Sequence, residues 1–162
     1  MTLSRIIATA AMTLLASTVT AEWALNTVCD DPPNGTQYCV PVVGCFDDSN
    51  NVTFIGRATG AGAPNGLIYG RTNQGIVCEG NWVSNTDLGF GRASFACEDG
   101  RQGHLTYTSV DPSTGTTFGS GVTEDGVQIR VWSGRAIDQF VMTDNGDLDT
   151  RLMCNGIPIP LS

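Results

Sequence analysis

The chain contains no lysine, a single histidine at position 104, and little positive charge. Its eight basic residues are all arginines, against 16 aspartates and glutamates. A surface of this charge repels phosphate backbones and anionic membranes, so we expect no nucleic-acid partner. Acidity also keeps an exported protein soluble, which is the more ordinary reason for such a composition.

Several common catalytic motifs are missing as well. The sequence has no G-x-S-x-G turn of a serine hydrolase and no phosphate-binding glycine loop followed by a helix. His104 is the only imidazole, and a lone histidine on a polar strand face is usually a surface residue. We therefore expect no cofactor, and we favour a protein that is not an enzyme.

A long hydrophobic run occurs only at the N-terminus. Arg5 precedes an apolar stretch over residues 6–19, which is too short to cross a bilayer as a helix. Val19-Thr20-Ala21 then supplies the small residues of a cleavage site. Residues 1–21 therefore predict a secretory signal peptide, with an uncleaved membrane anchor as the alternative. We expect a periplasmic or secreted protein with no membrane span after cleavage.

Removal of those 21 of the 162 residues would leave 141, enough for one domain with its own core. Seven arginines and all 16 acidic residues would remain, for a net charge of about −9. Six cysteines also lie in this part of the chain. They are Cys29, Cys39, Cys45, Cys78, Cys97 and Cys154. An even number in an exported chain predicts disulfides. A metal site is disfavoured, because the chain has no C-x-x-C pair.

The spacing of the cysteines favours one connectivity without excluding others. We prefer a bond between Cys78 and Cys97 as directly opposed strand residues. Cys29 and Cys39 flank a Pro-Asn-Gly turn, and their pairing would leave the other two cysteines to tie the start of the domain to its end. The remaining connectivities stay open.

The part of the chain after residue 21 has no stretch with apolar residues at helical spacing. It has short runs of period two separated by turns, and the whole chain contains 20 glycines. Four dipeptides are typical of hairpin turns: Asn65-Gly66, Asp99-Gly100, Asp125-Gly126 and Asn145-Gly146. The pattern predicts an all-β antiparallel meander, stapled by disulfides, that closes into a small barrel or sandwich. We expect an irregular, disulfide-tied segment over 22–51 and the meander over 52–162.

The segment 78–107 predicts its own strand register. If Cys78 faces Cys97, small residues meet aromatic rings across the pair: Gly80 faces Phe95, and Trp82 faces Ala93. If residues 98–100 form a three-residue loop, the next strand follows: Phe95 faces Gly103, Ala93 faces Leu105, and Gly91 faces Tyr107. One face of three strands then carries the large apolar side chains, which supports this register.

The same device recurs 26 residues later, where residues 120–133 align with residues 94–107. In the second copy, a loop over 124–126 places Gly121 opposite Ile129 and Gly119 opposite Val131. The repeat predicts a meander built of similar hairpins.

Three glycine-bearing motifs follow one another in this region. They are C-x-G at 78–80, G-x-G at 89–91 and C-x-D-G-R-x-G at 97–103. Their order over about residues 75–134 resembles exported, mostly uncharacterised β-rich proteins of proteobacteria. The resemblance implies a β-meander domain in the bacterial envelope and no known reaction.

Two groups of residues are candidates for binding. Trp132 and Arg130 alternate with the apolar face of their strand, so an exposed ligand surface there is one interpretation and a second core the other. Asp144, Asp147 and Asp149 form a weak candidate calcium site without the EF-hand order. The Glu-Asp pairs at 98–99 and 124–125 fit hairpin tips better than a glycosidase cleft.

We therefore expect an exported, non-catalytic binding or structural module with a protein or glycan partner. A small exported hydrolase using aspartate and glutamate is one alternative, and a calcium-binding protein is another. A pocket converging on Glu79, Glu98 and His104 would favour the hydrolase.

Overall fold

The computed structural model describes residues 25, 27–62, 64–85, 87, 89–141, 153–154 and 157–158. The expected signal peptide over 1–21, the Asn145-Gly146 turn and the calcium candidates Asp144, Asp147 and Asp149 lie outside the described residues.

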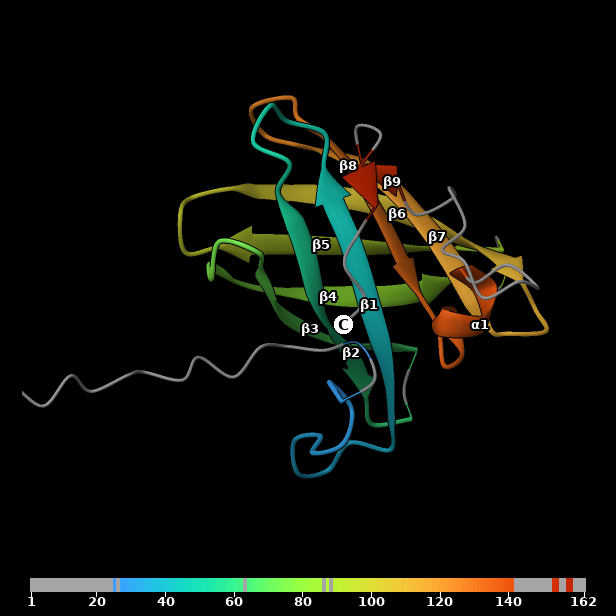
Figure 1. The fold of residues 1–162 in the computed structure, drawn as a ribbon. Coiled ribbons are helices and arrows are strands. Elements are labelled where there is room, and N and C mark those ends of the chain that lie inside the picture. The colour runs from blue at the N-terminus through green and yellow to red at the C-terminus, as the bar shows by residue number, and fades with distance from the viewer. Residues whose placement is uncertain are drawn as a thin grey trace, which may run out of the picture.

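Eight antiparallel strands close into a barrel in which each strand pairs with the next and β8 pairs with β1. The strands are β1 (Tyr38–Phe46), β2 (Thr53–Gly60), β3 (Asn65–Thr72), β4 (Val77–Asn85), β5 (Phe90–Cys97), β6 (Gln102–Asp111), β7 (Thr116–Thr123) and β8 (Gln128–Ser133). A short helix α1 (Ile137–Val141) and the pair β9 (Met153–Cys154) and β10 (Ile157–Pro158) follow. Figure 1 shows α1 outside the barrel wall, near β7. The all-β prediction is confirmed, and the architecture is a barrel.

The registers predicted for β4–β6 and for β7–β8 are those of the structure. Cys97 N–H donates to the Arg101 carbonyl oxygen at 2.7 Å, which closes the three-residue loop. Gly100 takes a φ of +90° there, and Gly126 takes +88° in the matching loop of the second hairpin. A left-handed residue at this place lets the turn follow the twist of the two strands, and glycine adopts it without strain.

The expected boundary between an irregular segment and the meander is wrong, because β1 lies within 22–51 and completes the barrel. Pro41 within this stretch argued against a paired strand. Its carbonyl oxygen accepts from Gly134 N–H, just beyond the end of the β8 ladder. The N and O of a strand residue point to the same side, so the absent Pro41 N–H costs nothing in the ladder with β2. Asn65-Gly66 is likewise not a turn but the start of β3.

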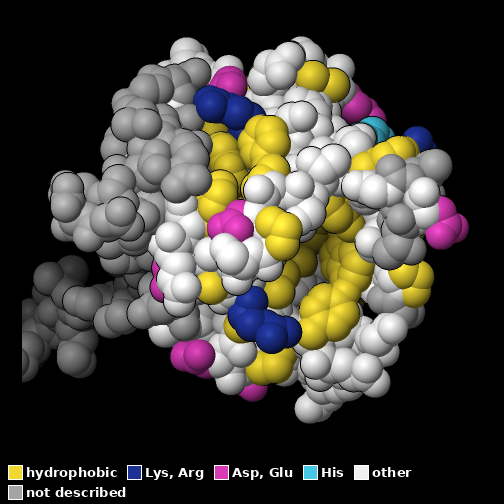
Figure 2. All heavy atoms as spheres, turned by 90° about the vertical axis from the view of Figure 1, so that its right-hand side faces the viewer, with side chains coloured by type: hydrophobic (Ala, Val, Ile, Leu, Met, Phe, Trp, Pro, Cys, Tyr) yellow, Lys and Arg dark blue, Asp and Glu magenta, His cyan; other side chains and the backbone are white. Residues whose placement is uncertain are grey.

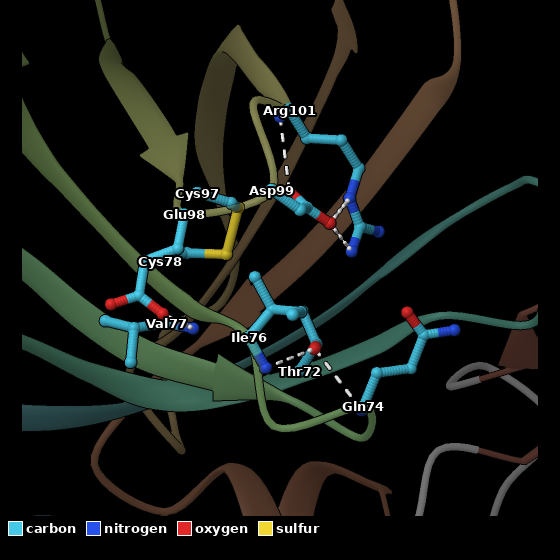
Figure 3. Close-up of a disulfide and its surroundings, with 9 residues drawn as sticks. All are labelled: Thr72, Gln74, Ile76, Val77, Cys78, Cys97, Glu98, Asp99 and Arg101. Carbon is cyan, nitrogen blue, oxygen red and sulfur yellow. Dashed lines mark hydrogen bonds and ion pairs between the residues drawn. A yellow bond between two sulfur atoms is a disulfide. The ribbon is translucent and has the colours of Figure 1, made fainter.

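Three disulfides form as preferred: Cys29–Cys39, Cys45–Cys154 and Cys78–Cys97. The last, which Figure 3 shows with its surroundings, joins directly opposed residues of β4 and β5. Both of its cysteines are buried. Three disulfides fit a non-reducing compartment. Within the described residues, no helix is long and apolar enough to cross a membrane.

One end of the barrel, where β1 ends and β4 begins, is filled by side chains. Phe46 and Phe95 meet edge to face there, with ring centroids 5.7 Å apart. The Arg101 guanidinium lies 4.6 Å from the Phe46 ring centroid, and its Nε donates to Asp99 at 2.7 Å. This cation–π contact covers the apolar core at what we call the closed end.

A second apolar cluster lies outside the barrel wall. Its buried members are Leu25, Val43, Cys45, Trp132, Ile137 and Cys154. Segments before β1 and after β8 therefore cover the outer face of these two strands, and the Cys45–Cys154 disulfide ties the later segment to β1.

Candidate functional site

A cavity of about 260 Å³ lies in the half of the barrel opposite the closed end. We call its mouth the open end, where β1 begins and β8 ends. Figure 2 views the molecule from the right-hand side of Figure 1 and shows a hollow lined by hydrophobic side chains. The lining residues come from all eight strands, from the turn between β6 and β7 at Gly115, and from Gly134 just after β8.

The floor of the cavity is aliphatic. Five residues line both this cavity and a much smaller one of about 40 Å³ toward the closed end: Val42, Ile68, Ala93, Leu105 and Val131. They separate the open half of the barrel from the packed half, so a bound molecule would rest on methyl groups.

Three aromatic rings line the walls, and a glycine lies under each. A Cβ at Gly60 would overlap the Tyr38 ring, and one at Gly91 would overlap the Tyr107 ring. A Cβ at Gly66 would meet Trp82, whose Nε1–H donates to the Thr59 carbonyl oxygen at 3.0 Å. The rings lie flat against neighbouring strands because those strands have no side chain there. The Tyr38 and Trp82 centroids are 5.6 Å apart at a tilt of 56°.

The polar groups of the lining side chains are hydroxyls, except for the indole N–H of Trp82. The Oγ1 of Thr117 lies 2.7 Å from the Oγ of Ser133. Burial raises the pKa of Tyr107, and the nearby Tyr38 raises it further, while a hydrogen bond with Ser84 acts in the opposite direction. Burial also raises the pKa of Tyr38. None of the described residues that line the cavity carries a formal charge at neutral pH, so this lining favours uncharged groups.

Trp132 and Arg130 do not form the exposed ligand surface that was one of the two interpretations of their strand. Trp132 is only 5% exposed and lies in the cluster outside the barrel, with Phe118 at a centroid distance of 5.2 Å. The second-core interpretation is the one that holds. Arg130 forms an ion pair with Asp47, with N–O distances of 2.7 and 3.1 Å. This pair joins β8 to the turn after β1.

The residues considered for hydrolysis do not line the cavity. Glu79 and His104 are exposed on the outer face, on strands that lie on either side of β5. The Asp99 carboxylate bonds to Arg101 at a hairpin tip, where Arg101 holds the pKa of Asp99 below its usual range. These contacts therefore support the interpretation of the Glu-Asp pair at 98–99 as a hairpin tip and not as part of a glycosidase cleft.

Two carboxylates in other turns make local hydrogen bonds. Asp48 accepts from Asn50 N–H at 2.9 Å, and Asp125 bonds to the Thr123 hydroxyl. Among the described residues, no three histidines, cysteines, aspartates or glutamates gather as metal ligands.

The residue pattern predicts that Trp82, Leu105 and Tyr107 share one face, but it does not predict that this face borders a cavity. It also does not identify Tyr38, Thr117 and Ser133 as lining residues. The available signal was the small residue opposite each ring, because a wall rich in glycine leaves space as well as admitting aromatics.

No protein-family model and no curated protein matches the chain. Two designed barrels are similar to it in structure. One is a redesigned β-barrel, mFAP1, bound to DFHBI, with a TM-score of 0.48, 16% identity and coverage of 60% of this chain and 92% of that one. The other is a fluorescence-activating β-barrel designed de novo, with a TM-score of 0.46, 14% identity and coverage of 60% of this chain and 90% of that one. At these scores the likeness carries no information about a ligand.

Proposed function

We propose that this protein is an exported, non-catalytic binding module that holds a small apolar molecule inside its barrel. The observation that carries this proposal is the cavity of about 260 Å³ with an aliphatic floor and aromatic walls. An eight-stranded barrel is wide enough either to be filled by side chains or to hold one small ligand. In this chain, side chains fill the barrel at the closed end, and the cavity at the open end has room for a ligand.

The cavity is larger than folding alone would favour. Protein interiors are close-packed, and an enclosed void destabilises a fold by about 24 cal/mol per Å³. That coefficient applied to 260 Å³ corresponds to about 6 kcal/mol for a sealed void. An open mouth admits water and lowers this cost. A molecule that covers the apolar floor would recover part of it.

The volume limits the size of the ligand. A cavity of about 150 Å³ holds a benzene ring, so one of 260 Å³ holds about ten non-hydrogen atoms. Burial of that many carbon atoms at about 0.8 kcal/mol each gives about 8 kcal/mol before the entropy lost on binding. We expect dissociation constants from micromolar to submillimolar. A glycan fits less well, because the floor offers it no polar partner.

Export is supported by the three disulfides, which persist in oxidising compartments such as the bacterial periplasm or outside the cell. A hydrolase is less favoured, because the lining residues within the described part of the chain include no aspartate, glutamate or histidine. The bacterial envelope as the site of action rests on the sequence resemblance over about residues 75–134.

The test is a titration with naphthalene, followed through the amide NMR signals of Gly119 and Gly134, which line the cavity. Ala58 also lines it, and Ala58→Phe would fill it. Ala96 is exposed on the outer face, so Ala96→Phe is the matched control. We expect saturable shifts in wild type and Ala96→Phe, and loss of at least tenfold in affinity in Ala58→Phe. Absence of saturable shifts in wild type, or equal binding by both variants, would overturn the proposal.

A further inference from the structure

The cavity changes character along the barrel axis. On five strands, the lining residue nearest the open end carries a hydroxyl, and the next lining residue inward carries none. These pairs, from the mouth inward, are Tyr38 and Val40, Ser84 and Trp82, Tyr107 and Leu105, Thr117 and Gly119, and Ser133 and Val131. The hydroxyls therefore form a ring at the mouth, above walls and a floor that are otherwise apolar.

The hydroxyls meet at the mouth because neighbouring strands run in opposite directions. Tyr38 begins β1 and Ser133 ends β8, while Ser84 is the last residue but one of β4 and Tyr107 lies in the second half of β6. In an up-and-down barrel, the starts of odd-numbered strands and the ends of even-numbered strands meet at the same end. Positions far apart in the sequence thus reach one level of the barrel.

The hydroxyl ring has hydrogen-bonding capacity to spare. Each hydroxyl donates one hydrogen bond and accepts two. The Thr117 and Ser133 hydroxyls bond to each other at 2.7 Å, the Thr117 hydroxyl also donates to the Ser133 carbonyl oxygen at 3.4 Å, and Tyr107 bonds with Ser84. These three bonds use three of the five donors and two of the ten acceptor positions of the hydroxyl ring. Farther inside, the Trp82 indole N–H already donates to the Thr59 carbonyl oxygen. A polar group of a ligand therefore finds side-chain partners at the mouth.

The charge of the cavity restricts the ligand further. Among the residues that the structure describes, its lining has no arginine to pair with an anion and no carboxylate to pair with a cation. An unpaired charge in such a place is strongly disfavoured. The acidic chain, with a net formal charge of −8, also repels an approaching anion.

We infer that the ligand is an uncharged amphipathic molecule, with a ring system that enters first and a hydroxyl or carbonyl group that stays at the hydroxyl ring. This inference rests on the proposed function and adds the ligand's class and orientation. The flat walls formed by Tyr38, Trp82 and Tyr107 favour an aromatic ring over an aliphatic chain, because ring faces and edges attract one another.

Three probes with the same ring system test the polar end: naphthalene, 2-naphthol and 2-naphthoate. One or two hydrogen bonds at the mouth predict that 2-naphthol binds about 5- to 50-fold more tightly than naphthalene. The anion 2-naphthoate is expected to bind more weakly than 2-naphthol. The aliphatic 1-nonanol, which carries the same hydroxyl, tests the aromatic walls and is expected to bind more weakly than 2-naphthol.

Two threonine variants test the place of the polar group. Thr117→Val replaces a hydroxyl of the ring by a methyl group at nearly constant shape, and we expect it to weaken 2-naphthol binding about 3- to 10-fold without weakening naphthalene binding. Thr106 is exposed on the outer face, so Thr106→Val is the matched control and is expected to change neither.

The outcomes separate this inference from the proposed function. Binding of none of the four probes would refute both. Equal affinity of naphthalene and 2-naphthol, an equal effect of Thr117→Val on both, or tighter binding of 2-naphthoate or 1-nonanol than of 2-naphthol would refute the ligand class alone. A selective loss of 2-naphthol affinity in Thr117→Val supports it.

Discussion

Removal of the Cys78–Cys97 disulfide, through Cys78→Ala combined with Cys97→Ala, tests how the barrel is stabilised. The two residues are directly opposed on β4 and β5, and they are 2% and 8% exposed. The ladder between the strands pairs them even without the bond. The disulfide then acts chiefly on the unfolded chain, whose freedom it restricts.

The loop length sets the expected magnitude. The bond closes a loop with a sequence separation of 19 residues. The chain-entropy relation gives about 3 kcal/mol at 25 °C for this length, and the space left by the two sulfur atoms adds about 1 kcal/mol. A loss of about 3 to 4 kcal/mol is a large share of the roughly 5–15 kcal/mol that holds a domain of this size together.

The assay is equilibrium urea unfolding without reductant, followed by circular dichroism. The other two disulfides are the comparison, because their separations are 10 and 109 residues. For double alanine variants at Cys29–Cys39 and Cys45–Cys154, loop closure alone gives losses of about 2.7 and 4.8 kcal/mol, compared with about 3 kcal/mol for Cys78–Cys97. Naphthalene affinity is expected to survive removal of the Cys78–Cys97 bond, since neither cysteine lines the larger cavity.

Two results would refute this reasoning. One is a loss in the Cys78–Cys97 variant below about 1 kcal/mol, which would show that the unfolded chain is already restricted without the bond. The other is a set of three losses that does not rise with loop length, which would show that native-state contacts, and not loop closure, decide the stability.

Three further predictions concern single groups. Gly66→Ala is expected to lower stability by about 2 to 3 kcal/mol and to shift Trp82 fluorescence, because the added carbon overlaps the ring and the neighbouring strand; an unchanged melting temperature would contradict this. Asp99 has a lowered pKa because Arg101 bonds to it, so its contribution is present above the unfolded pKa near 4 and is lost as the pH falls through the folded pKa. The free energy of unfolding in urea should therefore decrease more from pH 6 to pH 3 in wild type than in Asp99→Asn. The difference between the two decreases should be at most about 1 kcal/mol. The pKa of Tyr107 is raised above 10.0 by burial, so stability should fall as the pH rises from about 10 through the folded pKa. Tyr107→Phe should remove one late-titrating phenol from an ultraviolet titration, and an unchanged titration would contradict this.

The strand register in the middle of the chain was predictable because its causes are local. The loop over 98–100 sets the pairing of β5 and β6, and the small residues opposite each ring agree with that pairing. Hairpin turns and cross-strand neighbours act within about 20 residues, so a single sequence displays them. The disulfide between Cys78 and Cys97 followed from the same register.

The burial of Trp132 was not decided by its place in the sequence. Alternation along β8 correctly put it on the face opposite Val131. That face is the outside of the barrel, and only the cover supplied by Leu25, Ile137 and Cys154 makes it a second core. Alternation tells which face a residue is on, but what covers that face depends on segments that lie far apart in the chain.

The sequence by itself determined the all-β class, the hairpins, the preferred disulfides and the apolar face of the central strands. These follow from turn chemistry, period-two alternation and cysteine number, which are properties of short segments. Only the tertiary structure decided that β1 joins β8 and that the hydroxyls of Tyr38, Tyr107 and Ser133 meet at one mouth. The cavity exists because ring closure of eight strands sets an interior width that glycine-rich walls do not fill.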